Sequence, residues 1–110
     1  MTRIILARDF SLYPMGRSEE DGSDNGQRFF TEFLLPHLEA NTHVTVVFDG
    51  VHSFGSSFLD EAFHEMPASH NIGADRFKRL VSIEAKGRAY AFYKRMVESF
   101  IDKIPPAKPK

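Results

Sequence analysis

Apolar residues recur along this chain in patterns that alternate between the spacing of strands and the spacing of helices. Residues 4–7 form an apolar run rich in β-branched side chains and end in charge near Asp9, which predicts a strand of about five residues. Residues 43–49 form a nearly continuous apolar run, typical of a central strand covered on both faces. Residues 79–84 alternate well enough to predict a further strand.

Three other segments carry apolar residues at three- and four-residue spacing, the pattern of an amphipathic helix. They are residues 27–40, 57–66 and 88–104. Pro36 lies inside the first segment, where a proline removes a backbone hydrogen bond, so we expect a kink or a break between Leu35 and His37. For the same reason the second helix is expected to end at Met66, before Pro67.

The remaining segments read as connections. Residues 10–26 accumulate Gly, Pro, Asp, Asn and Ser without apolar periodicity, and a loop of this length usually binds something or is disordered. Residues 67–75 are expected to form a surface connection. We expect one domain over residues 1–104, followed by a disordered basic and proline-rich tail over residues 105–110.

This order of elements implies an α/β domain, with parallel pairing wherever a helical crossover joins two strands. The carboxyl ends of such strands form the crevice in which α/β domains usually bind ligands. Asp49 and Ser57 are therefore expected near the working edge of the sheet.

Composition excludes several classes of function. With 42% hydrophobic residues in 110, the chain can bury one core, and a net charge of -1 gives no field that would collect a polyanion. The absence of cysteine excludes disulfides and thiolate sites, and no apolar segment is long enough to span a bilayer. We expect a cytoplasmic protein that binds neither membrane nor nucleic acid.

Two adjacent serines, Ser56 and Ser57, open the second predicted helix. Ser57 and Asp60 match the spacing of a capping box, in which the serine would cap the helix. A helix start also stabilises negative charge, so a phosphate on either hydroxyl would be favoured there. Both roles, helix cap and phosphoacceptor, remain open at this point.

Glycines and arginines around the long loop form a second candidate site. Arg17 and Arg28 flank a glycine-bearing loop that enters the first helix, an arrangement that could grip a phosphate or carboxylate. The candidates for interaction or anion binding are Gly16, Arg17, Gly26, Arg28, Asp49 and Gly50. This would make a small-anion or nucleotide-binding domain. Alternatively, Arg17 pairs with nearby acidic residues and orders the loop, while Asp49 accepts backbone hydrogen bonds in a turn.

A serine hydrolase is a third alternative. Its members would be Ser57, a histidine among His52, His64 and His70, and either Asp49 or Asp60. The Gly-x-Ser-x-Gly sequence of many hydrolases is absent. No pair of histidines has metal-site spacing, so we expect neither a metal nor another cofactor.

Short motifs along the chain carry a family resemblance. They occur in the order Asp9-Phe10-Ser11, Gly16-Arg17, Asp21-Gly22, Gly26 with Arg28-Phe29, Leu35-Pro36-His37-Leu38, Phe48-Asp49-Gly50-Val51 and Ser56-Ser57-Phe58-Leu59-Asp60-Glu61-Ala62-Phe63. Together they resemble the STAS-like domain family of unknown function. The chain is similar, more remotely, to the STAS domains of anti-sigma factor antagonists, whose helix begins Asp-Ser-Ser-Gly-Leu where this chain has Gly55-Ser56-Ser57-Phe58-Leu59.

The resemblance implies a small STAS-like α/β domain with a mixed β-sheet of about four strands and three helices packed on it. It also implies a non-enzymatic regulatory or protein-interaction module. In the antagonists the second serine is phosphorylated by a partner of the histidine-kinase-type ATPase class, which by position implies Ser57 here. Phosphorylation would add about -1.5 to -2 charges at the helix start and repel nearby carboxylates, as an off-signal requires.

Overall fold

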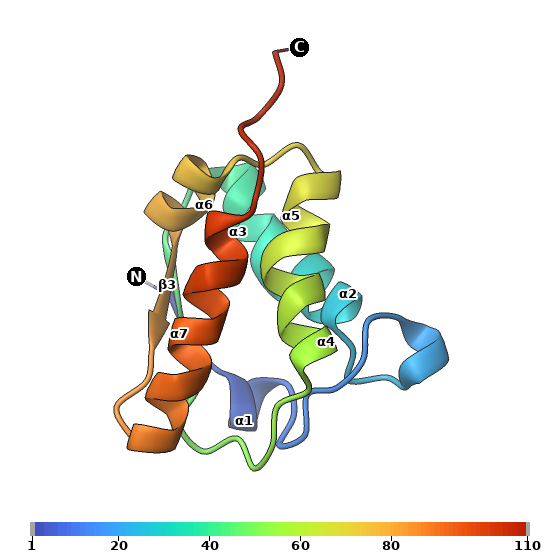
Figure 1. The fold of residues 1–110 in the computed structure, drawn as a ribbon, viewed down its shortest axis with the longest axis vertical. Coiled ribbons are helices and arrows are strands. Elements are labelled where there is room, and N and C mark those ends of the chain that lie inside the picture. The colour runs from blue at the N-terminus through green and yellow to red at the C-terminus, as the bar shows by residue number, and fades with distance from the viewer. Residues whose placement is uncertain (1, 110) are drawn as a thin grey trace.

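The computed structural model describes residues 2–109 and shows a parallel sheet with helices packed against one face (Figure 1). The three strands are β1 (Thr2–Ile5), β2 (Val44–Val47) and β3 (Val81–Glu84), in the order β1-β2-β3. Both pairs are parallel, with Ile4 opposite Val46 and Val46 opposite Ile83. The prediction of a mixed sheet of about four strands is therefore wrong for the described residues. Helical crossovers join all three strands, and such connections return the chain in the same direction.

The helices are more numerous than the three predicted. Counted as continuous helices, the described residues form five, together with one 3₁₀ turn. Their segments are α1 (Leu6–Asp9), η1 (Glu19–Asp21, 3₁₀), α2 (Gly26–Phe29), η2 (Phe30–Leu34), α3 (Leu35–Ala40), α4 (Ser56–Asp60), η3 (Glu61–Glu65), α5 (Met66–Ser69), α6 (Ala74–Leu80) and α7 (Arg88–Asp102).

Two of these helices were absent from the sequence prediction. The first strand ends at Ile5, because the Asp9 carboxylate accepts the Ile5 N–H at 2.8 Å and closes the short helix α1. The expected surface connection over residues 67–75 and the start of the expected strand at Arg79 are instead partly helical. Helix α6 runs to Leu80, and the Val81 N–H still donates to the Phe77 carbonyl as β3 begins.

Neither proline ends its helix, and both follow a widened turn. The Leu35 N–H donates to the Phe30 carbonyl and the Met66 N–H to the Glu61 carbonyl, five residues back in each case. The segments η2 and η3 are thus π-helical turns that end two residues before Pro36 and Pro67. Since the π turn shifts the hydrogen-bond register, it accommodates a residue that lacks an N–H and crowds the preceding carbonyl. Of the predicted kink or break at Pro36, the break is therefore wrong, and so is the predicted helix end at Met66.

A cluster of phenylalanines fills the space between sheet and helices. Phe29, Phe48, Phe58, Phe63 and Phe77 are all fully buried. Phe63 is central, with ring centroids 6.1 Å from Phe48 and 6.2 Å from both Phe29 and Phe77. The cluster joins the continuous helix formed by α4 and η3 to the residue that follows β2 and to α6.

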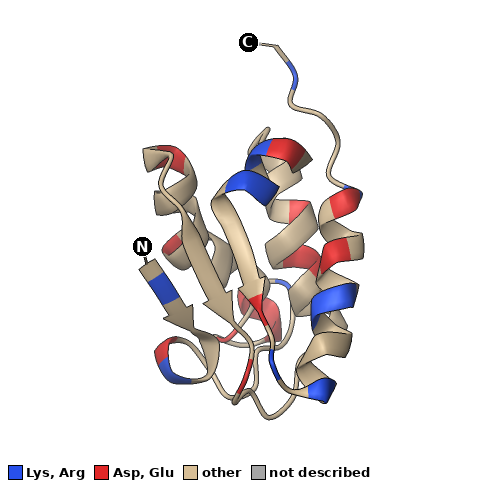
Figure 2. Ribbon diagram, turned by 90° about the vertical axis from the view of Figure 1, so that its left-hand side faces the viewer, with Lys and Arg blue, Asp and Glu red and all other residues tan. Residues whose placement is uncertain are grey.

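The second face of the sheet carries no helix within the described part of the chain. Figure 2 looks onto this face, with β3 at one edge of the sheet and α7 beside it. The expectation that β2 is central is confirmed, but helices cover it on one face only. Beyond α7, the tail exchanges two hydrogen bonds between Lys108 and Asn71, at 3.0 and 2.8 Å. Within residues 2–109 no helix is both long and apolar enough to cross a membrane.

Candidate functional site

The site lies where the chain leaves β2 and enters α4. Gly50 has a φ of 101°, a left-handed conformation that favours glycine, and it turns the chain after Asp49. Gly55 then occupies the N-cap position of α4 in an extended conformation. Ser56 and Ser57 are the first two helical residues, and both are exposed.

The predicted capping box is absent. Ser57 lies inside the helix rather than at its N-cap, and no side chain caps this end. Asp60 instead bonds Arg17 and His64. Within residues 2–109, neither serine hydroxyl makes a hydrogen bond to another side chain or to the backbone, so both are free to react or to bind.

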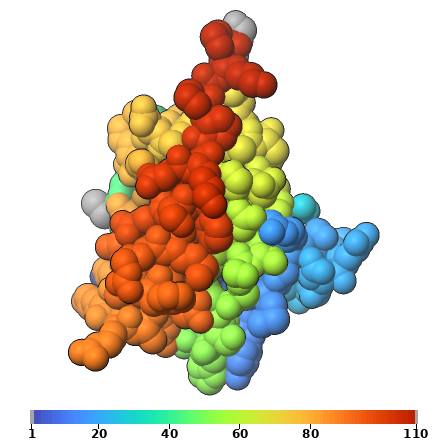
Figure 3. All heavy atoms as spheres, in the orientation of Figure 1, coloured from blue at the N-terminus to red at the C-terminus, as the bar shows by residue number. Residues whose placement is uncertain are grey.

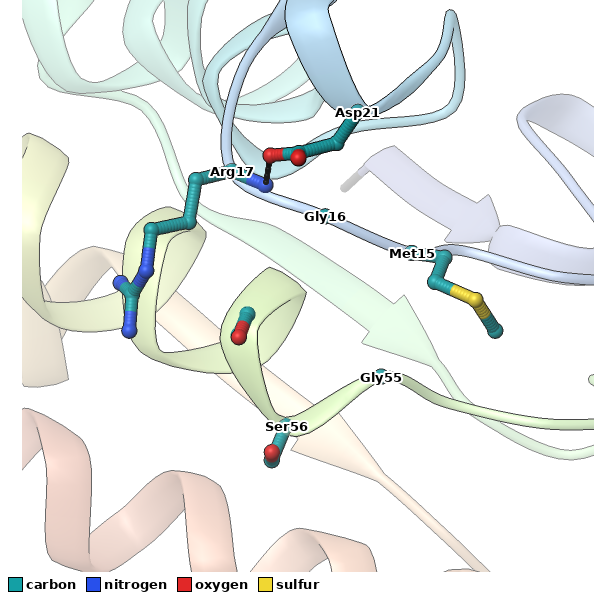
Figure 4. A pocket seen from close by; sticks show the side chains of 7 residues that line it. Met15, Gly16, Arg17, Asp21, Gly55 and Ser56 are labelled. Atoms are coloured by element: carbon teal, nitrogen blue, oxygen red, sulfur yellow. Dashed lines mark hydrogen bonds between the residues drawn. The ribbon is translucent and has the colours of Figure 1, made fainter.

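The long loop forms the opposite wall of a cleft at this helix start. The cleft has a volume of about 570 Å³. The loop lines it with Met15, Gly16, Arg17 and Asp21, and the helix start lines it with Gly55, Ser56 and Ser57 (Figure 4). In Figure 3 the loop and the start of α4 lie side by side at the surface, in blue and green. Figure 4 shows the Ser56 side chain pointing away from the loop that carries Arg17.

Hydrogen bonds within the loop hold this wall in place. The Gly55 N–H donates to the Pro14 carbonyl at 2.9 Å, and the Gly26 N–H donates to the Gly16 carbonyl at 2.9 Å. The Asp21 carboxylate accepts the Arg17 N–H at 2.9 Å, and this bond lowers the pKa of Asp21. Gly16 has a φ of 85° and packs against Asp21 so closely that a side chain would clash.

Arg17 connects the loop to the helix through two carboxylates. Its guanidinium lies 3.0 Å from Asp60 and 3.3 Å from Glu61, which is only 8% exposed. Burial lowers the pKa of Arg17, but the hydrogen bonds to Asp60 and Glu61 outweigh it and raise the pKa overall. Since two carboxylates share this one cation, Arg17 offers no free positive charge to an external anion. The alternative interpretation paired Arg17 with acidic residues of its own loop, whereas its side chain pairs with Asp60 of α4 and Glu61 of η3.

Several of the predicted candidates lie outside this cleft. Arg28 pairs with Asp24 at 3.4 Å and Glu32 at 3.3 Å, and its guanidinium lies 4.7 Å from the centre of the Phe10 ring. Gly26 is buried where α2 meets α4. The structure therefore brings Gly16 and Arg17 together with the serines, but leaves Gly26, Arg28, Asp49 and Gly50 outside the residues that line the cleft.

Asp49 joins the end of β2 to the start of α7. Its carboxylate accepts the Lys86 N–H at 2.9 Å and the Gly87 N–H at 2.8 Å. Burial raises the pKa of Asp49, but the hydrogen bonds from Gly87 and Lys86 outweigh it and hold the pKa below its usual range. The alternative role weighed for this residue, a backbone acceptor at a strand end, is the one that the structure shows.

One group of side chains has the geometry of metal ligands. Asp60, His64 and Glu65 place potential ligand atoms within 4.8 Å of one another. The spacing of histidines alone does not reveal this group, because its signal in the sequence is an aspartate four residues before a histidine on one helix. The Asp60 carboxylate is also bonded to Arg17, whose positive charge opposes a metal ion there.

The residues of the hydrolase alternative do not form a triad in residues 2–109. Ser57 donates to no histidine, His64 bonds Asp60 at 2.8 Å, and His52 lies 3.0 Å from the Tyr13 hydroxyl. A triad needs a hydrogen bond between the serine and its base. This arrangement provides none.

Comparison with protein families identifies the fold. The family model of the STAS-like domain of unknown function (DUF4325) matches residues 25–86, more than half of the chain. The chain belongs to this STAS-like family. The matched part contains β2, α4 and both serines, whereas Arg17 lies before it. Comparisons with curated proteins and with solved structures found no match.

Proposed function

We propose that this STAS-like domain is a non-enzymatic regulatory module that binds a partner protein through the start of α4. Phosphorylation of Ser57, with Ser56 as the alternative acceptor, switches this binding. The proposed partner is an ATPase of the histidine-kinase type, which would transfer a phosphoryl group to the serine oxygen. The antagonist STAS domains, which this chain resembles, supply the class of partner.

The observation that carries the proposal is the state of the two hydroxyls. Each is exposed in the first turn of α4 and has no hydrogen-bond partner within residues 2–109, although a helix start usually employs such a group as a cap. Exposed backbone N–H groups of the same turn favour an anion. A kinase could reach either serine without breaking an existing interaction.

The arrangement around the serines explains how a phosphate would act on a partner. Asp60 and Glu61 lie one turn further along the helix, and their shared cation is Arg17. A phosphate brings about two more negative charges to this surface. A partner that fits the uncharged serine would then face strong like-charge repulsion and desolvation cost.

The alternative of a small-anion site receives less support from the same geometry. The guanidinium of Arg17 is bonded to Asp60 and Glu61, and that of Arg28 lies over Phe10 outside the cleft. The positive charge of Arg17, which a free phosphate in the cleft would need, is thus already compensated by two carboxylates. We therefore favour the protein partner.

The test compares partner capture by the wild type and by Ser57→Ala, Ser57→Asp and Ser53→Asp variants. Ser53→Asp is the matched control, because Ser53 is exposed in the preceding loop and adds the same charge outside the helix. We expect the wild type, Ser57→Ala and Ser53→Asp to retain the same ATPase and Ser57→Asp to lose it. Mass spectrometry after incubation with that ATPase and ATP should find phosphate on Ser57. Equal capture by all four proteins would refute the switch.

A further inference from the structure

A groove runs along the free edge of the sheet, away from the serine cleft. It lies between β3 and α7 and has a volume of about 580 Å³. Ile83 is half-buried and gives it apolar surface, over a floor that includes the buried Val81 and Ile101, while Lys94 and Glu98 line it from the helix. In Figure 2, β3 lies at the edge of the sheet beside α7.

The backbone of β3 can still form hydrogen bonds on this side. The Glu84 carbonyl accepts the Phe48 N–H at 2.9 Å, so Glu84 directs its backbone toward the β2 side. Because alternate residues of a strand direct their backbone groups to opposite sides, Ile83 directs its N–H and carbonyl outward. β3 is an edge strand in the sheet of residues 2–109, and it contains no proline to block pairing.

The groove carries one positive and one negative side chain that are complementary to the same two side chains of a second copy. Lys78 is paired with Asp102 at 2.6 Å. Lys94 and Glu98 have no ionic partner within residues 2–109, although they lie one helical turn apart. A strongly acidic or basic peptide would leave one of them facing a like charge. A second copy related by a two-fold axis would satisfy both, because its antiparallel α7 brings Glu98 to Lys94 and Lys94 to Glu98.

We propose that this groove binds a second copy of the chain. The two β3 strands pair antiparallel through Ile83 and extend the sheet across the two-fold axis. The two α7 helices then face each other with reciprocal Lys94–Glu98 ion pairs. This interface leaves the start of α4 exposed, so a dimer could still present its serines to another protein.

The test measures molar mass by light scattering over a range of protein concentrations. The wild type should approach twice the 12.5 kDa of one chain as concentration rises. Lys94→Glu and Glu98→Lys should each remain monomeric to at least tenfold higher concentration. Their equimolar mixture and the Lys94→Glu/Glu98→Lys double variant should dimerise again, since both restore opposite charges at each contact.

A proline variant tests the strand pairing separately. Ile83→Pro removes an N–H that points outward and therefore should abolish the dimer while leaving the β2–β3 ladder intact. Circular dichroism establishes whether it folds, and the charge variants decide the question if it does not. A wild type that stays monomeric at every concentration overturns the proposal. A dimer that the charge exchanges leave unchanged overturns it as well.

Discussion

Replacing Gly26 by alanine tests the packing that holds the serine helix in place. Gly26 begins α2 and lies against the next helix, where an added Cβ would be 2.8 Å from both the Phe58 carbonyl oxygen and the Glu61 Cβ. It would also lie 3.1 Å from the Ala62 nitrogen. These neighbours are mostly backbone and cannot rotate away, so the two helices must separate.

The sign of the effect follows from two opposing magnitudes. Alanine favours a helix over glycine by at most about 1 kcal/mol, whereas overpacking costs about 1–3 kcal/mol. The first helical position reduces the gain, because its N–H has no intrahelical partner in either variant. We therefore expect Gly26→Ala to lower the free energy of unfolding by about 1–2 kcal/mol.

Urea unfolding followed by circular dichroism provides the measurement, with Gly73→Ala as the matched control. A Cβ on Gly73 would lie 2.9 Å from the Ala107 nitrogen, an equally close contact, but with the C-terminal tail rather than with another helix. Moving the tail would exchange its two exposed hydrogen bonds to Asn71 for bonds to water and would separate no helices. The control should therefore lower the free energy of unfolding by less than Gly26→Ala does. A Gly26→Ala variant as stable as the wild type, or a control with an equal loss, would refute the reasoning.

Three further variants test the fold and the site. Asp49→Asn should lose about 1–2 kcal/mol, because it replaces a charged acceptor of two N–H groups. The folded-state pKa of Asp49 is lowered, so its contribution is complete above the unfolded value near 3.9 and is lost as pH falls through the folded pKa. Unfolding measured against pH should show the difference from the wild type shrinking below about pH 4, and a constant difference would contradict this. Phe63→Ala removes a fully buried ring and should lower the free energy of unfolding by about 3–5 kcal/mol in denaturant titration. A loss below about 1 kcal/mol would show that the core collapses around the gap. Ser57→Asp should change the free energy of unfolding, measured by thermal denaturation, by less than about 0.5 kcal/mol, because the helix-dipole gain of about 0.3–1 kcal/mol opposes repulsion from nearby carboxylates. A large loss would mean that the binding defect of this variant reflects unfolding.

Long periodic segments could be predicted from the sequence. The stripe of apolar residues after Arg88 matches α7, and the run after His43 matches β2 as the central strand. The junction between β2 and the serine helix follows from both, and the family match agrees with the resemblance. These elements are specified by burial of one face, which produces a regular spacing of apolar residues in the sequence.

Elements that depend on hydrogen-bond register could not be predicted in the same way. A proline normally ends a helix, and the apolar spacing of these segments does not signal the π turns before Pro36 and Pro67. The capping box failed for a related reason. Ser57 and Asp60 have the right spacing, but the helix begins at Ser56 with Gly55 as its N-cap, so Ser57 is not in the capping position. The Asp60 carboxylate instead pairs with Arg17, forty-three positions earlier in the chain. Contacts between distant segments therefore decided the chemistry of the site.

Arg17 also determines what the proposed phosphorylation would change locally. A phosphate on Ser57 would compete for its guanidinium, since a phosphate dianion binds arginine more strongly than one carboxylate does. Release of Arg17 would leave Glu61, only 8% exposed, with the Gln27 amide at 3.3 Å as its remaining side-chain partner among residues 2–109. An uncompensated buried carboxylate is costly, so Arg17 should resist this exchange. Under the proposed function, the phosphate therefore stays largely uncompensated at the surface, and its charge acts on the partner rather than on the fold.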